Sequence, residues 1–119
     1  MAKTELETRT KNFALDLIDL VERMPRNRAG NVVGSPLLRS GTSMGANYRE
    51  ANRAESAKDF QHKVGVATKE SAETEFWLEL VSESDHLQTE GSSKMLDESR
   101  ELIAILTSIG RNAKISAKK

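Results

Sequence analysis

Cysteine is absent from the 119-residue chain, and proline occurs only twice, as Pro25 and Pro36. Without cysteine the protein has no disulfide, no thiolate metal site and no cysteine nucleophile. The scarcity of proline leaves room for long helices, because a proline in the interior of a helix tends to break it. Aromatic residues make up only 4% of the chain. Since few rings are available to stack on bases, sequence-specific recognition of single-stranded nucleic acid is not expected.

Long apolar runs are missing as well. No apolar segment approaches the roughly 20 residues that a membrane-spanning helix needs, and the polar stretch Met1–Thr10 is unlike a signal peptide. We therefore expect a cytoplasmic protein without a membrane partner. The length of the chain fits a single domain, residues 1–119, with one hydrophobic core.

Apolar residues recur with helical spacing in four segments, at about residues 4–24, 31–53, 56–84 and 93–111. The third segment has the clearest seam, with alternating spacings of four and three residues in Phe60, Val64, Ala67, Ser71, Thr74, Leu78 and Val81. Such a seam is typical of a helix that packs nearly parallel or antiparallel to its neighbours. The pattern predicts an all-α fold, an antiparallel up-down-up-down four-helix bundle.

Capping residues and helix breakers indicate where the helices begin and end. Ser56 resembles the N-cap of the third helix. Ser35 and Pro36 resemble an N-cap followed by the proline that a first turn favours, although the apolar pattern of the second segment reaches back to about residue 31. We expect the basic tail, residues 112–119, to fray.

Apolar residues outside the third seam predict a second buried surface. Phe76, Trp77 and Leu80 lie off this seam, and the fourth segment is also apolar beyond one stripe. A helix at the surface of a bundle needs only one apolar stripe. The sequence therefore predicts that part of this apolar surface is buried between subunits.

Charge is balanced overall, with 18 basic and 18 acidic residues, but it is unevenly distributed. Residues 23–69 carry a net charge of +6 and residues 102–119 one of +4, whereas residues 70–101 carry −8. Stripes of cations can match a phosphate backbone, which attracts them without base specificity; the alternative is an ordinary solvated helix face. The candidate nucleic-acid-binding residues on the second and third segments are Arg39, Arg49, Arg53, Lys58 and Lys69.

Patterns that resemble catalytic or metal sites lack the context that they need. The segment Gly41–Gly45 (GTSMG) matches the pattern of a serine nucleophile, but no strand precedes it. We expect instead that Gly41 and Gly45, one turn apart, admit a neighbouring helix. Two Asp/Glu-x-x-His pairs, which end at His62 and His86, lie about 36 Å apart on one helix and cannot share a metal. We therefore expect no enzyme activity, no metal and no cofactor.

Two blocks of the sequence resemble a known family. One is residues 37–51, LLRSGTSMGANYREA, and the other combines Asp59-Phe60, residues 67–74 (ATKESAET) and residues 76–78 (FWL). Together they are similar to the four-helix-bundle proteins encoded within intervening sequences of bacterial 23S ribosomal RNA genes, a family that includes the accessory variability protein of diversity-generating retroelements. The match covers the second and third segments closely and the outer two by pattern and length. Pro36 departs from the family pattern, in which a polar residue is usual.

The resemblance implies a ring-like homopentamer of four-helix protomers without enzyme activity. For the retroelement member it implies nucleic-acid binding and a reverse transcriptase partner. Together with the basic stripes, it favours a non-enzymatic oligomer that contacts the phosphate backbone of structured RNA or DNA. The alternative is a protein-interaction scaffold or adaptor, for example for a reverse transcriptase, whose acidic third segment docks a basic partner.

Overall fold

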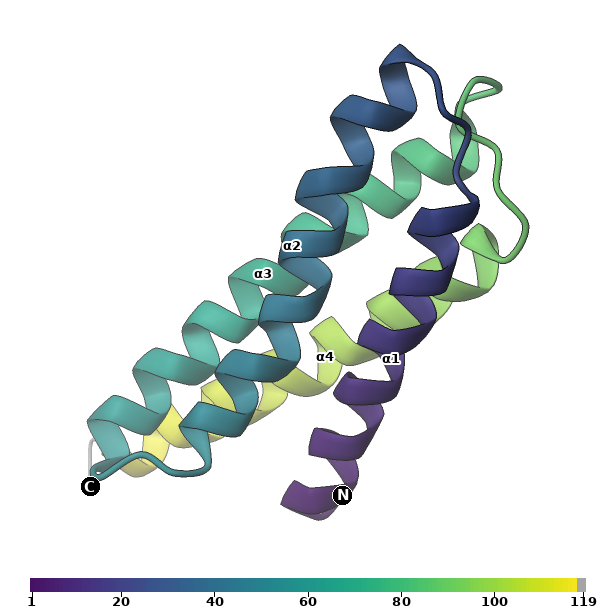
Figure 1. The fold of residues 1–119 in the computed structure, drawn as a ribbon. Helices are drawn as coiled ribbons and strands as arrows, with labels where there is room; N and C mark the ends of the chain where they lie inside the picture. Colours follow the sequence, from purple (N-terminus) through teal and green to yellow (C-terminus); the bar gives the residue numbers. More distant parts are fainter. Residues whose placement is uncertain (118–119) are drawn as a thin grey trace.

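The computed structural model describes residues 1–117 and consists of four helices (Figure 1). They are α1 (Lys3–Arg23), α2 (Arg28–Ala51), α3 (Ala57–Glu83) and α4 (Ser92–Ala117). Residues 1–117 contain no strand, and the predicted all-α helix bundle is confirmed. Because the four helices are long and lie along one direction, the molecule measures 51 × 21 × 19 Å.

Each helix packs against two others. α3 lies between α2 and α4, whereas α1 packs against α2 and, less closely, against α4 (Figure 1). α1 and α3 therefore occupy diagonal positions in the bundle. Polar contacts connect neighbouring helices. Thr74 Oγ1 on α3 donates a hydrogen bond of 2.9 Å to Ser40 Oγ on α2. Arg100 Nε on α4 lies 3.2 Å from Glu75 Oε2 on α3.

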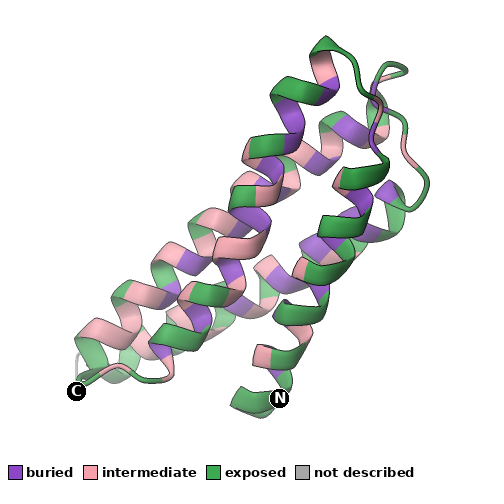
Figure 2. Ribbon diagram, viewed as in Figure 1, coloured by how far each residue is buried: buried purple, intermediate pink, exposed green. Residues whose placement is uncertain are grey.

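The core lies along the inward faces of all four helices (Figure 2). Every helix contributes leucines that are 0% exposed, among them Leu17, Leu37, Leu78 and Leu102. The seam predicted for the third segment is the buried face of α3, and only Phe60 at its start remains partly exposed. Helical periodicity therefore located the core face of α3 correctly.

Two glycines bring α1 close to α2. A Cβ atom at Gly41 would lie 2.0 Å from Leu17 Cδ2, and one at Gly45 would lie 3.1 Å from Thr10 Oγ1. Larger residues at these positions would separate the two helices. The predicted role of Gly41 and Gly45 in admitting a neighbouring helix is confirmed, and Ser43 lies between them in the middle of α2.

The start of α2 differs from the prediction. The helix begins at Arg28, ahead of the predicted residue 31, and the predicted cap at Ser35 is wrong. Asn27 is the true N-cap, because its Oδ1 accepts a hydrogen bond of 2.7 Å from the backbone N–H of Gly30. Pro36 lies inside α2, so the segment before it is a helix and not a connection.

The other helix ends lie closer to the positions predicted from the sequence. Ser56 caps α3, since its Oγ accepts a hydrogen bond of 3.0 Å from the backbone N–H of Asp59. α4 continues to Ala117, six residues beyond the predicted end of the fourth helix at residue 111. Lys118 and Lys119, the rest of the predicted tail, lie outside the described residues. The two basic side chains Arg111 and Lys114 are thus held on a helix.

Candidate functional site

The five candidate cations do not form one surface. Arg39 and Arg49 project from α2, Arg53 lies in the turn beyond the end of α2, and Lys58 and Lys69 lie on α3. All five are exposed. What distinguishes them is whether an acidic side chain of the same chain already compensates their charge.

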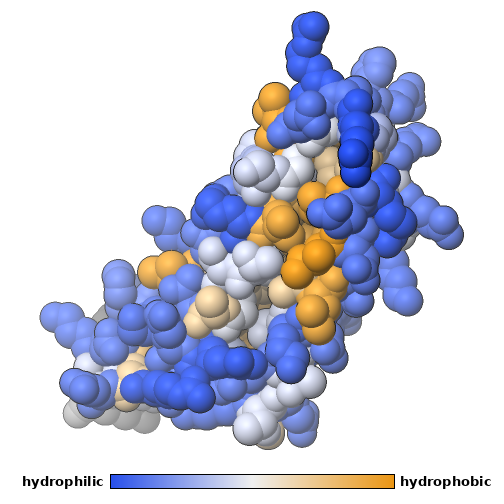
Figure 3. Space-filling view, viewed as in Figure 1, coloured by the Kyte–Doolittle hydropathy of each residue, from blue (hydrophilic) through white to orange (hydrophobic). Residues whose placement is uncertain are grey.

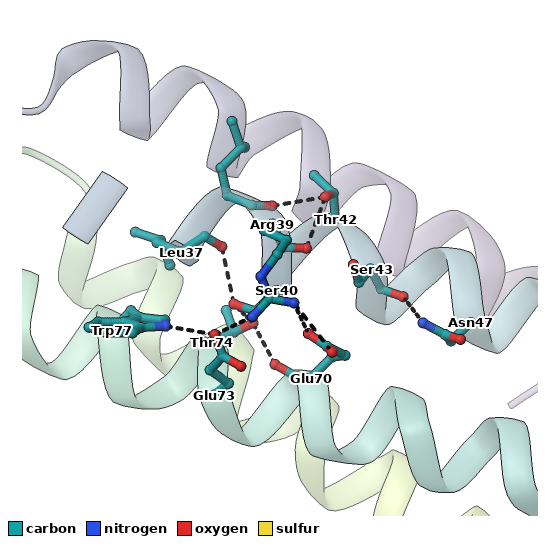
Figure 4. A network of polar contacts seen from close by, with 11 residues as sticks. Leu37, Arg39, Ser40, Thr42, Ser43, Asn47, Glu70, Glu73, Thr74 and Trp77 are labelled. Atoms are coloured by element: carbon teal, nitrogen blue, oxygen red, sulfur yellow. Dashed lines mark hydrogen bonds and ion pairs between the residues drawn. The ribbon is translucent and has the colours of Figure 1, made fainter. Parts of the chain in front are cut away.

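Arg39 is held by two glutamates of α3 (Figure 4). Its Nη1 lies 3.1 Å from Glu70 Oε2, and its Nη2 donates to Glu73 Oε2. Glu73 Oε2 also accepts a hydrogen bond of 3.0 Å from the indole Nε1 of Trp77. The pKa of Arg39 is raised by the hydrogen bond to Glu73 and by the charge of Glu70. The pKa of Glu73 is lowered by its bonds from Trp77 and then from Arg39.

Arg49 is occupied in a similar way. Its Nε lies 3.4 Å from Glu7 Oε1 on α1, and Glu7 Oε2 accepts a hydrogen bond of 2.9 Å from Asn52 Nδ2. The last turn of α2 is thereby linked to α1. Arg39 and Arg49 therefore each form ion pairs with glutamates of the same protomer. The sequence did not reveal these pairs, because the glutamates belong to other helices.

The other three candidates have no ion-pair partner among residues 1–117. Arg53 lies in the short turn that joins α2 to α3, and Lys58 is the second residue of α3. Lys69 is eleven residues further along α3, which corresponds to about 16 Å along the helix axis. Arg53 and Lys58 therefore lie at the same end of the bundle, and Lys69 lies apart from them.

Two further cations lie at the same end of the bundle as Arg53 and Lys58. Lys3 Nζ is 5.5 Å from the centre of the Phe60 ring, and Lys3 lines a shallow pocket with the first turn of α3 and the last turns of α4. Lys114 is in these last turns. We call Lys3, Arg53, Lys58 and Lys114 the basic end. Sequence reasoning missed Lys3 and Lys114, because contacts at the ends of the outer helices depend on the topology.

Acidic residues gather elsewhere, around a groove of about 760 Å³ between α1 and α4. Its lining includes three basic residues and six acidic ones, Glu5, Asp16, Asp19, Asp97, Glu98 and Glu101. Arg9 crosses the groove and donates hydrogen bonds of 2.7 and 2.6 Å to the two carboxylate oxygens of Glu98. These bonds lower the pKa of Glu98. The groove keeps a net negative charge.

No cluster of metal ligands is present in the described part of the chain, where groups of three or more His, Asp or Glu side chains do not converge. His86 lies in the loop after α3, so the expectation that both acid–histidine pairs share one helix is wrong. None of the helices, as far as they are described, combines the length and apolar character needed to cross a bilayer.

The shifted carboxyl pKa values predict an acid-sensitive fold. Because the folded pKa values of Glu73 and Glu98 are lowered, their stabilisation is present above the unfolded pKa of about 4.3 and is lost as the pH falls through the folded values. We expect Tm to fall on acidification below about pH 4. Glu98→Gln is expected to reduce that fall and to cost about 0.5 kcal/mol at neutral pH.

Thermal melts followed by circular dichroism between about pH 3 and pH 7 measure this effect. The matched control is Glu55→Gln, which changes an exposed glutamate that has no ion-pair partner among the described residues. Identical acid sensitivity in Glu98→Gln and the unaltered protein would contradict the role of the Arg9–Glu98 pair.

Comparisons with known proteins agree with this architecture. The family model described as 23S rRNA-intervening sequence protein matches residues 3–108. A crystal structure of a protein of unknown function from the S23 ribosomal protein family of Bacteroides thetaiotaomicron is 34% identical, with a TM-score of 0.82, over 93% of this chain and 99% of that chain. No curated protein matches. The chain therefore belongs to the family of 23S rRNA-intervening sequence proteins.

Proposed function

We propose that the protein is a non-enzymatic, oligomeric nucleic-acid-binding protein that contacts the phosphate backbone of structured RNA or DNA. The observation that carries this proposal is the basic end, whose four cations have no ion-pair partner among the described residues. Cations that form no ion pair within the chain are available to displace counterions from phosphates. Arg39 and Arg49 contribute less, because glutamates of the same chain compensate their charge.

The exposed side chains determine how the protein can contact a nucleic acid. Phe13 and Tyr48 are 2% and 3% exposed, so these rings cannot stack on bases. Phe76 is 52% exposed, but it lies sixteen residues after Phe60 on α3, about 24 Å along the helix axis from the basic end. Contacts from lysine and arginine to phosphates position a protein on a nucleic acid but carry no base information. Binding is therefore expected to depend steeply on salt and little on sequence.

The double reversal Arg53→Glu/Lys58→Glu tests the basic end. It removes two cations from each protomer, so we expect the affinity for structured RNA at low salt to fall by at least about tenfold. The slope of log K against log salt is negative, and its magnitude is expected to decrease by about 2 for each protomer that contacts the nucleic acid. Fluorescence anisotropy titrations over a series of salt concentrations measure both quantities.

The matched control is Arg26→Glu/Arg28→Glu, which makes the same charge change at two exposed residues, Arg26 in the connection between α1 and α2 and Arg28 at the start of α2. These residues lie at the other end of the molecule from the turn between α2 and α3 (Figure 1). If both variants lose affinity equally, net charge and not the basic end governs binding. If the unaltered protein binds neither RNA nor DNA at low salt, the proposed function is wrong.

The second candidate function is that of a protein-interaction scaffold or adaptor. The net acidic groove between α1 and α4 favours it, since a groove lined by six acidic residues suits a basic partner protein. A reverse transcriptase is one such partner that the family resemblance suggests. Under this alternative the protein binds its partner with a salt-dependent affinity and has no measurable affinity for nucleic acid.

We also propose that the helices follow each other in antiparallel, up-down-up-down order and that protomers assemble into a ring-like homopentamer. The order of the contacts supports the topology, because Arg39 pairs with Glu70 whereas Glu50, further along α2, pairs with Lys63, earlier on α3. Exposed apolar side chains on α1 and α3 support assembly.

A further inference from the structure

The exposed large hydrophobic residues of the described chain gather on two adjoining faces of the bundle. We call these the α1–α2 face and the α2–α3 face, after the helices that form each of them. Apart from Met1 and Ile115 near the chain ends, the residues are Leu15, Ile18, Val32, Phe76 and Leu80. A contact between proteins that covers both faces is favourable, because it removes apolar surface from water.

The α1–α2 face has an apolar centre that belongs mainly to α1. Leu15 and Ile18 are 51% and 39% exposed. Val21 and Leu38 are half-buried where α1 and α2 meet, and they line the same shallow hollow. Hydrophobic residues therefore gather over α1 and the adjoining edge of α2 on the face shown in Figure 3.

The apolar centre of the α2–α3 face belongs mainly to α3. Phe76 and Leu80 are 52% and 36% exposed, and the half-buried Trp77 packs edge-on against the Phe76 ring. Val32 of α2 is 65% exposed. It is seven residues before Arg39, so both side chains project from the same side of α2, and the partners of Arg39 lie on α3. Each face thus has its own apolar centre.

Both apolar centres lie at the same level along the bundle. A Cβ atom at Gly41 would approach Leu17 on α1 and Thr74 on α3, so these three residues mark one level. Ile18 is one residue further along α1 and Phe76 is two residues further along α3, which corresponds to about 1.5 and 3 Å. In an assembly closed by rotation alone, surfaces that meet have to lie at the same level.

The helix that the two faces share, α2, offers opposite charges to them. Arg49 projects toward α1, where its Nε lies 3.4 Å from Glu7 Oε1, and its side chain is 46% exposed. Glu50 projects toward α3, where its Oε2 lies 3.4 Å from Lys63 Nζ, and its side chain is 63% exposed. Adjacent residues of a helix differ in level by only about 1.5 Å. Arg49 on the α1–α2 face of one copy can therefore meet Glu50 on the α2–α3 face of another.

We propose that the α1–α2 face of one protomer binds the α2–α3 face of the next protomer. This inference rests on the proposed homo-oligomer and helix order, and it names the surfaces through which the ring forms. In this contact α1 lies beside α3 of the neighbour, so the two apolar centres cover each other. α2 lies beside α2 of the neighbour, with Arg49 opposite Glu50.

The directions of the helices and the angle between the faces fit a ring of five protomers. Rotation about an axis along the bundle keeps the direction of every helix, so α1 and α3, which run in the same direction, meet in parallel. In a ring of five, the two contact faces of a protomer make an angle of about 108°, and adjoining faces of a four-helix bundle meet at roughly a right angle. Because the two faces join at α2, this helix lies nearest to the ring axis.

Twofold contacts explain the exposed apolar surface less well. A twofold contact of the α1–α2 face with itself covers Leu15 and Ile18 but leaves Phe76 and Leu80 in water. A twofold contact of the α2–α3 face with itself leaves Leu15 and Ile18 in water. Only a head-to-tail contact covers both apolar centres with one kind of interface, and its repetition closes a ring.

Glutamate substitutions at the two apolar centres test the contact. Without nucleic acid, the unaltered protein is expected to be a pentamer by gel filtration with light scattering. Ile18→Glu and Phe76→Glu are each expected to be monomeric with unchanged helicity by circular dichroism, because each disrupts one of the two faces that a ring needs. Ile115→Glu is the matched control, since Ile115 is exposed to the same 52% as Phe76 but lies on α4, outside both faces.

The outcomes separate this contact from the proposed function. An oligomer that survives both substitutions would overturn the contact alone. A monomeric unaltered protein would overturn both the assembly and the contact, whereas RNA binding by such a monomer would leave the role of the basic end intact.

Cysteine cross-linking of mixed variants tests which faces meet, since the chain has no cysteine of its own. Thr42 lies beside α1 residues on the α1–α2 face, and Ser43 is seven residues before Glu50, on the α3 side of α2. One variant combines Phe76→Glu with Thr42→Cys and keeps its α1–α2 face. The other combines Ile18→Glu with Ser43→Cys and keeps its α2–α3 face. On mild oxidation the mixture is expected to give disulfide-linked dimers and nothing larger.

The matched control exchanges the two cysteines, so that Thr42→Cys accompanies Ile18→Glu and Ser43→Cys accompanies Phe76→Glu. Each cysteine then lies on the disrupted face, and the yield of dimer is expected to fall at least about tenfold. Equal cross-linking in the two mixtures would show that random collisions join the chains, and it would overturn the head-to-tail contact.

Discussion

Replacing Leu17 by alanine is expected to destabilise the protein by about 3 kcal/mol. Leu17 is 0% exposed on α1 and lies directly against Gly41 of α2. Its truncation therefore removes apolar contacts and leaves a cavity between two helices. Denaturant unfolding followed by circular dichroism measures the loss. The control Val32→Ala truncates an aliphatic side chain that is 65% exposed, and we expect it to cost no more than about 0.5 kcal/mol.

A double-mutant cycle with Gly41→Ala makes this prediction specific to the contact between α1 and α2. In the unaltered protein the new methyl group would lie 2.0 Å from Leu17 Cδ2, so we expect a net destabilisation of about 1 kcal/mol despite the better helix propensity of alanine. In the Leu17→Ala background the obstacle is gone, and Gly41→Ala is expected to stabilise by about 1 kcal/mol. Effects of equal sign in both backgrounds would contradict the close approach at Gly41.

Gly30→Ala is expected to destabilise the protein by about 2 kcal/mol. A Cβ atom at Gly30 would lie 2.0 Å from the backbone oxygen of Pro25 and 3.2 Å from Asn27 Oδ1. Unlike a side chain, this backbone cannot change rotamer, so the connection between α1 and α2 must shift. The shift also disturbs the Asn27 cap, which depends on the N–H of Gly30.

The same substitution at Gly65 is expected to have the opposite sign. Gly65 lies in α3 with nothing within 4 Å of an added Cβ, so Gly65→Ala is expected to stabilise by about 1 kcal/mol through helix propensity. The pair compares one chemical change in two environments, and unfolding in urea measures both variants. Stabilisation by Gly30→Ala would show that the connection between α1 and α2 yields readily.

Local patterns determined the elements of this fold. A hydrophobic seam and an N-cap such as Ser56 act over a few residues, so they can be read before any tertiary contact is known. Gly41 and Gly45 were correctly interpreted as a site of close helix packing, because two glycines one turn apart in a helical pattern have few other roles. These features depend on spacing alone.

Helix ends were harder to predict from the sequence where two local signals compete. Asn27 lies only four residues after the end of α1, and its side chain caps α2. Ser35 and Pro36 resembled the N-cap and first-turn proline of the second helix more closely. Pro36 lies inside α2, where it has no N–H to donate to the carbonyl group of Val32, so the helix continues through it with one backbone hydrogen bond fewer.

What the sequence by itself determined is the helical architecture, the residues of the core and the uneven distribution of charge along the chain. Only the tertiary structure decided which of those charges are available. Arg39 and Arg49 are compensated by Glu70, Glu73 and Glu7 from neighbouring helices, whereas Arg53 and Lys58 are not. The reason is physical: the strength of an ion pair depends on the distance between two charges in space, and that distance is unrelated to their separation along the chain.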